Sequence, residues 1–132
     1  MKQLADTHVV VWWLTADPSL PAAYKRLLDA AERRGPRIGV SAISLWEIAK
    51  LHERGRLILE SSLAQCLEDV EAGAAFEIVP LTAEIAAEST RLAPPFPKDP
   101  ADQIIAATAR CRGLSLLTLD ERIRQSGAVA IA

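Results

Sequence analysis

Four acidic residues of this chain stand next to apolar stretches, where a carboxylate is costly to bury unless it is paired or bound to a cation. They are Asp6, Glu47, Asp102 and Asp120. The set contains no His or Cys, and carboxylates alone suit hard cations, Mg²⁺ or Mn²⁺, far better than zinc. If the four side chains meet in the folded protein, the chemistry that they would support is metal-ion catalysis.

Each acid also has a structural explanation. The first and the last of the four would cap the helices that follow them. Ser44 and Glu47 fit a capping box, in which the serine accepts from a helix amide and the glutamate reaches back. Asp99 would be the N-cap of the helix that carries Asp102, with Pro100 at its first position. Singly, these structural roles are favoured. Together, four like charges in one poorly solvated cleft would repel by several kcal/mol, and a divalent cation would remove that penalty.

An alternating pattern of strands and helices must position these acids. Short apolar runs predict strands at 2–5, 37–42, 76–81, 114–120 and 128–131. Amphipathic spacing with Pro and Gly boundaries predicts helices at 8–15, 21–34, 43–55, 61–73, 82–92, 101–113 and 121–127, and four prolines make 93–100 a rigid loop. This order predicts an α/β fold, with a mostly parallel central sheet flanked by helices on both faces. Ligands bind beyond the carboxyl ends of such strands, so we expect three of the acids at one sheet edge. Asp102 joins them if its helix starts there.

The composition fits one globular domain over residues 1–132, because half of the residues are hydrophobic and 24% are charged. No apolar run approaches the roughly 18 to 20 residues that cross a bilayer, and no signal-peptide pattern opens the chain. We therefore expect a cytoplasmic protein without a membrane partner. The net charge of −2 does not by itself indicate a nucleic-acid binder. Cys66 and Cys111 have neither zinc-site nor disulfide spacing.

The chain resembles the PIN domain family, in the branch formed by VapC-type toxins of bacterial toxin–antitoxin pairs. The resemblance covers almost the whole chain and rests on the order and spacing of four blocks: LADTHVVVWWL, SAISLWEIAKLHERGRL, FPKDPADQIIAATA and GLSLLTLDERI. It implies a PIN-like fold and a Mg²⁺-dependent endoribonuclease, with Mn²⁺ as a substitute ion. It also implies a homodimer and a cognate antitoxin whose tail lies over the active-site groove.

The resemblance assigns roles to individual residues. The positions that match the family's catalytic and metal-binding acids are Asp6, Glu47, Asp102 and Asp120. Thr7 and Thr118 match the hydroxyl residues that accompany the first and last acids. Asp99 matches the first acid of the D-P-x-D block, which we interpret as the helix cap and only secondarily as a ligand, and Ser44 supports Glu47 through the capping box.

Four positions depart from the family's usual pattern without removing an acid. Lys98 stands where His is frequent, and Ala101 stands where an aromatic residue is frequent. Gln103 replaces a frequent Arg, and Leu119 replaces a frequent Arg or Ala. These departures affect the expected substrate contacts and leave the expected metal site intact.

In such a site, one or two Mg²⁺ ions would bind the scissile phosphate, lower the pKa of a bound water and stabilise charge on the attacking and leaving oxygens. Two other classes remain open. One is another Mg²⁺-dependent phosphoryl-transfer domain, a phosphatase or receiver-like module with Asp6 as nucleophile or phosphate acceptor. The other is a non-catalytic PIN-like binding module. No Walker loop or G-x-G-x-x-G motif indicates a nucleotide cofactor.

The sequence predicts the locations of His8 and the three tryptophans less specifically than those of the acids. His8 is expected on a helix surface, with a place at the edge of the site as the less favoured alternative. Trp12, Trp13 and Trp46 are expected in core or dimer packing rather than in stacking on bases. Together with Leu51, they would leave an apolar patch that pairs two copies of the chain.

Overall fold

A parallel sheet of four strands lies at the centre of the computed structural model, which describes residues 1–132. The strands run in the order β3-β2-β1-β4. They are β1 (Gln3–Ala5), β2 (Ile38–Ser41), β3 (Phe76–Val79) and β4 (Ser115–Leu117). The helices are α1 (Thr7–Leu14), α2 (Ala22–Glu32), α3 (Ala42–Glu53), α4 (Leu63–Ala72), α5 (Ala83–Ser89), α6 (Pro100–Arg112) and α7 (Glu121–Ser126). The predicted α/β fold is confirmed.

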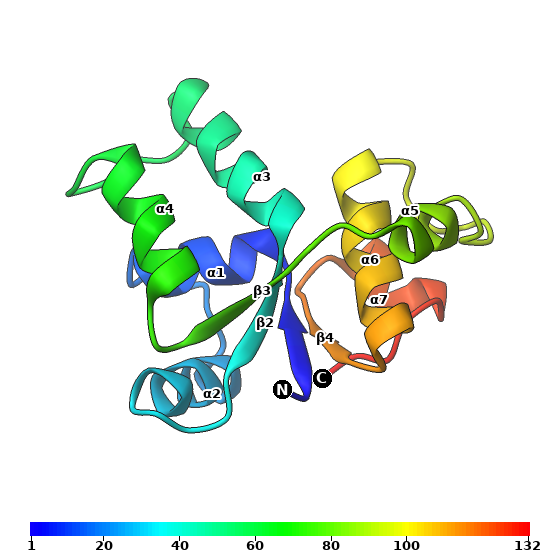
Figure 1. The fold of residues 1–132 in the computed structure, drawn as a ribbon, viewed down its shortest axis with the longest axis horizontal. Helices are drawn as coiled ribbons and strands as arrows, with labels where there is room; N and C mark the ends of the chain where they lie inside the picture. Colours follow the sequence, from blue (N-terminus) through cyan, green and yellow to red (C-terminus); the bar gives the residue numbers. More distant parts are fainter.

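Helices cover both faces of the sheet, α1 to α4 on one side and α5 to α7 on the other (Figure 1). Successive residues of a strand point to opposite faces, and the two core clusters follow this rule. Leu4 and Leu116 pack in the cluster under α5 to α7, whereas Ala5 and Leu117 pack in the cluster under α1 to α4. Because both faces are covered, neighbouring residues of these two strands are both apolar and buried, as is usual in parallel sheets.

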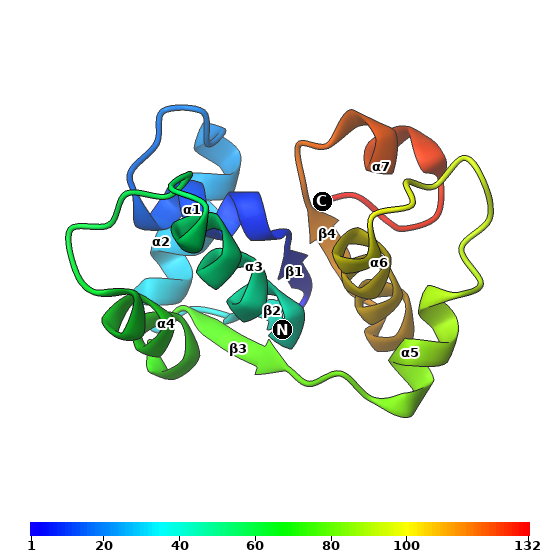
Figure 2. The same cartoon turned by 90° about the horizontal axis from the view of Figure 1, so that it is seen from above.

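The strand register brings three segments to one edge of the sheet. Ala5 of β1 pairs with Val40 of β2 on one side and with Leu117 of β4 on the other. The residues that follow these strands, Asp6 and Thr118 among them, therefore leave the sheet at the same level. Figure 2 shows α3 and α6 on opposite sides of β1.

The predicted strand at 128–131 is wrong. Gly127 ends α7 in the left-handed conformation, and the chain then meets β4 only through an isolated bridge between Ile131 and Leu116. Only Ala130 and Ala132 share backbone hydrogen bonds with Leu116, which makes a single bridge and not a strand. No helix of the fold is both long enough and apolar enough to span a bilayer.

Candidate active site

Asp6 stands where β1 ends and α1 begins. Its backbone N–H donates to the Leu117 carbonyl at 2.9 Å, which ties the residue to β4. Its Oδ1 accepts from the Thr7 N–H at 2.8 Å, and its Oδ2 accepts from the Thr118 hydroxyl at 2.7 Å. The expected N-cap is thus confirmed. With 3% of its surface exposed, Asp6 is a buried carboxylate whose hydrogen bonds hold it in one orientation.

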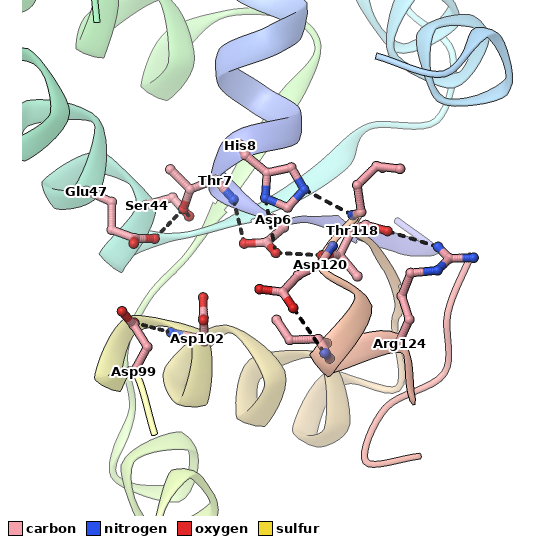
Figure 3. Close-up of polar contacts among 12 residues, drawn as sticks. Asp6, Thr7, His8, Ser44, Glu47, Asp99, Asp102, Thr118, Asp120 and Arg124 are labelled. Atoms are coloured by element: carbon pink, nitrogen blue, oxygen red, sulfur yellow. Dashed lines mark hydrogen bonds and ion pairs between the residues drawn. The ribbon is translucent and has the colours of Figure 1, made fainter. Parts of the chain in front are cut away.

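A chain of hydroxyl groups connects α1 to α3 (Figure 3). Thr7 Oγ1 lies 2.8 Å from Ser44 Oγ and 2.5 Å from Glu47 Oε1. An ionised carboxylate only accepts hydrogen bonds and a hydroxyl has a single proton to give. Thr7 therefore donates to Glu47, and Ser44 donates to Thr7. This contact holds the Glu47 carboxylate toward the end of β1.

The predicted capping box of Ser44 and Glu47 is wrong. α3 begins at Ala42, and its N-cap is Ser41, whose hydroxyl accepts from the Ile43 N–H at 3.3 Å. Because the helix starts earlier than expected, Ser44 lies in its first turn, where a fully buried hydroxyl is available to Thr7. The role of Ser44 is therefore to support the acids through Thr7 and not through a cap.

The start of α6 contributes Asp99 and Asp102. Asp99 is the N-cap and accepts from the Asp102 N–H at 3.1 Å, with Pro100 at the first helical position. The predicted cap is confirmed. Asp102 lies in the first turn, near the positive end of the helix dipole, and lines the same cleft as Asp6 and Glu47.

Asp120 caps α7 as expected, since its Oδ1 accepts from the Arg122 N–H at 2.9 Å and from the Ile123 N–H at 3.3 Å. Its own N–H donates to Thr118 Oγ1 at 3.1 Å. Thr118 therefore joins Asp120 to Asp6, because its hydroxyl accepts from one and donates to the other. Asp120 stands beside the main cleft rather than among the residues that line it.

The carboxylates of Asp6, Glu47, Asp102 and Asp120 turn toward a common space (Figure 3). Burial and then the charges of Asp6, Asp99, Glu47 and Asp120 raise the pKa of Asp102 to about 7. The pKa of Glu47 is also raised, mainly by burial and further by Asp6 and Asp99, against the opposing effect of the Thr7 hydrogen bond. The four acids therefore lie close enough together for their charges to act on Asp102.

His8 lies at the edge of the site, the less favoured of its two expected places. Its Nε2 accepts from the Leu119 N–H at 3.0 Å, which places the proton of the neutral ring on Nδ1. Nδ1 lies 3.5 Å from Asp6 Oδ2. The ring also packs edge-on against Trp12. The favoured helix-surface role is wrong, because the ring lines the cleft and accepts a hydrogen bond from Leu119, which is distant in sequence.

Asp6, Glu47 and Asp102 lie in an open cleft of about 420 Å³ between α3 and the start of α6. Its lining combines acidic, basic and aromatic side chains: Asp6, Thr7, His8, Trp46, Glu47, Lys50, Leu51, Arg54, Asp99, Pro100, Ala101 and Asp102. No three acids, histidines or cysteines form a ready-made set of metal ligands. Mg²⁺ keeps several of its waters in proteins and is held through only one or two carboxylates, so this carboxylate cleft fits such a cation.

The tryptophans divide into two groups. Trp12 and Trp13 are partly buried and pack against the core, and Trp13 also donates to Asp29 at 2.9 Å. The core expectation is confirmed for these two. Trp46 is not in the core, since it is 53% exposed and lines the cleft, and dimer packing of this residue stays a prediction.

The PIN domain family matches residues 4–128 of the chain. This chain is a PIN domain protein. Ribonuclease VapC22 of Mycobacterium tuberculosis is 36% identical to it over 125 residues, which make up 92% of this chain and 88% of that protein. The predicted family and its VapC branch are confirmed. Nucleases of the PIN domain family generally depend on divalent metal ions, which agrees with the carboxylate cleft.

Two solved structures share the fold of this PIN domain. VapBC2 from Rickettsia felis, bound to a DNA fragment from its promoter, has a TM-score of 0.72 at 16% identity, covering 100% of this chain and 98% of that chain. A toxin–antitoxin complex from Klebsiella pneumoniae has a TM-score of 0.66 at 21% identity, covering 98% of this chain and 96% of that chain.

Proposed function

We propose that this chain is a VapC-type toxin, a Mg²⁺-dependent endoribonuclease made of a single domain over residues 1–132. The observation that carries the proposal is the gathering of Asp6, Glu47 and Asp102 in one cleft. With Asp120 beside the cleft and Asp99 in it, these acids lie close enough that burial and their charges raise the pKa of Asp102 to about 7. The relative that is 36% identical bears the name ribonuclease. Four mutually repelling acids are a cost to a folded protein unless a cation uses them.

The proposed ligands and catalytic residues are Asp6, Glu47, Asp102 and Asp120. When bound, Mg²⁺ or Mn²⁺ would polarise the scissile phosphate of RNA and lower the pKa of a bound water. Hydrogen bonds within the protein hold two of these carboxylates in fixed orientations. Thr118 and the Thr7 N–H occupy one oxygen each of Asp6, and the Thr7 hydroxyl orients Glu47. Because the pKa of Asp102 is about 7, cation binding near neutral pH releases a proton from that site.

The geometry disfavours a phosphatase or receiver-like module with Asp6 as nucleophile. Both carboxylate oxygens of Asp6 already accept hydrogen bonds, and the residue is 3% exposed. A nucleophile must approach the phosphorus atom of its substrate, whereas a metal ligand can act from the wall of the cleft. The convergence of the acids also disfavours a purely binding module, which gains nothing from their repulsion.

The same proposal includes the partners. We propose that RNA is the substrate, that the protein works in the cytoplasm as a homodimer, and that a cognate antitoxin places its tail over the cleft. An arginine of that tail can pair two carboxylates in bidentate geometry, so it would suit the acidic cleft in the absence of the cation.

RNA cleavage tests the proposal directly. Purified protein freed of inhibitor should cut RNA with Mg²⁺ or Mn²⁺ and stop in EDTA. Asp102→Asn should abolish cleavage, while Asp69→Asn, which removes the same charge from an exposed position on α4, should cleave like wild type. Mn²⁺ binding, followed by electron paramagnetic resonance, should weaken in the Asp102 variant alone. A folded Asp102→Asn protein that cleaves at the wild-type rate would overturn the proposed site.

A further inference from the structure

One wall of the cleft is a face of α3 whose side chains have no role in the proposed metal site. Trp46, Lys50 and Arg54 follow one another at intervals of four residues, so they lie along one side of the helix. All three line the cleft, as does the neighbouring Leu51. Glu47 stands one residue from Trp46, so this face leads directly away from the proposed metal site.

Trp46 is the tryptophan that is free to stack on a ligand. It is 53% exposed, whereas Trp12 and Trp13 pack against the core. Leaving an indole in water forgoes the burial that large aromatic side chains usually find. Lys50 Nζ lies 5.9 Å from the centroid of the Trp46 ring, within cation–π range. An exposed ring beside a cation is the combination that single-strand binding proteins use to stack bases.

The positive charges of this face are available to a ligand. Arg54 makes no ion pair within the protein. Lys50 pairs only with Glu53, at 3.0 Å on the same helix, and exposed pairs of this kind contribute little. The opposite wall carries Asp99 and Asp102. A polyanion would therefore be attracted to the α3 side and would meet the acids only where a cation neutralises them.

We propose that this α3 wall binds single-stranded RNA, with an unpaired base stacked on Trp46 and a neighbouring phosphate paired with Arg54. The proposal rests on the ribonuclease function above and names the residues that would hold its RNA. A duplex cannot use the wall in this way, because its bases already stack on one another, whereas the bases of loops and ends can splay out onto an aromatic ring. Lys50 adds a second cation for the backbone beside the ring.

The test measures affinity by fluorescence polarisation. The probes are a fluorescein-labelled single-stranded RNA of eight nucleotides and a blunt RNA duplex, in Ca²⁺ in place of Mg²⁺, with probe integrity checked on a gel. Trp46→Ala should weaken binding of the single strand about 5-fold or more, the lower end of the loss for one stacked base. Trp46→Phe, which keeps an aromatic ring, should retain most of the wild-type affinity for the single strand. Duplex binding should change in neither variant.

A matched pair of variants tests the phosphate contact. Arg54→Ala should reduce the slope of log K against log salt concentration by about 0.7, the value for one phosphate of a single strand. Arg112→Ala removes the same charge from an exposed position at the far end of α6 and should leave the slope unchanged. Wild-type affinity in folded Trp46→Ala, or an equal loss for the duplex, would overturn the assignment.

Failure of this inference is distinguishable from failure of the proposed function. A wild-type protein that cuts no RNA in Mg²⁺ overturns the ribonuclease proposal. A wild type that cuts RNA, together with a Trp46→Ala variant that binds and cuts like it, overturns only the role of the α3 wall. Loss of affinity for the antitoxin alone would assign the wall to the protein partner and overturn its assignment to RNA.

Discussion

The substitution Asp102→Asn should stabilise the protein when no metal is present, and the gain should depend on pH. The pKa of this carboxyl is about 7 in the folded protein against 3.8 ordinarily, so the folded state prefers the neutral acid. Below pH 3.8 both states hold the proton and the two proteins differ little. As the pH rises toward 7, the unfolded chain gains from ionisation and the folded chain does not, so the wild type loses stability. Asparagine cannot ionise and loses none.

The size of the effect follows from the shift. About three pKa units at 1.36 kcal/mol each give an upper bound of about 4 kcal/mol. Water at the open side of the cleft screens the charges, so we expect about 1 to 2 kcal/mol above pH 7. For a chain of this length, each kcal/mol corresponds to about 3 to 5 °C in Tm.

Urea and thermal unfolding of both proteins in EDTA, at pH values from 4 to 8.5, measure the difference. Asp69→Asn is the control, because that acid is exposed and apart from the cleft. Adding Mg²⁺ should reverse the order above pH 7, since the wild type alone keeps the full set of ligands. A variant less stable than wild type at pH 8 in EDTA, or a difference independent of pH, would refute the electrostatic reasoning.

Three further predictions concern the same machinery. Thr118→Val should destabilise the fold by about 1 to 3 kcal/mol in urea titrations, because it leaves the Asp6 carboxylate and the Asp120 N–H without their buried partner. An equal stability would show that water replaces the hydroxyl. Asp6→Asn should weaken binding of an antitoxin-tail peptide by about 1.5 to 3 kcal/mol, and Mg²⁺ should compete with the peptide; calorimetry that finds neither effect places the inhibitor elsewhere. Light scattering should find a dimer at micromolar concentration, and a monomer would contradict the family-based expectation.

The apolar patch expected to pair two copies differs from the structure. Two of its tryptophans pack against the core, while Trp46 and Leu51 line the cleft. The large exposed apolar side chains are Met1, Trp46, Ile58 and Leu81. The dimer therefore remains a prediction from the family resemblance and not from an exposed tryptophan surface.

Local sequence signals determined the elements and most of the caps. The Asp99-Pro100 pair fixes the start of α6, and Asp120 fixes the start of α7, because a cap depends only on residues within one helical turn. The order of strands and helices likewise indicated the fold class. The prediction of Ser44 as a cap was wrong because two serines three residues apart offer alternative starts for α3. The helix begins after Ser41, and Ser44 is then placed to form a hydrogen bond with Thr7.

Only the tertiary structure decided which of these residues share a space. The sheet order places β1 between β2 and β4, so the two residues after β1, Asp6 and Thr7, meet residues about 110 and 40 positions away in the chain. His8 became part of the site because the Leu119 N–H reaches its ring, and Trp46 stayed exposed because the cleft lies beside it. Side-chain periodicity reports the nearest neighbours along the chain, whereas convergence of charges depends on strand register and helix placement. The sequence by itself therefore specified the acids, and the packing of the sheet made them one site.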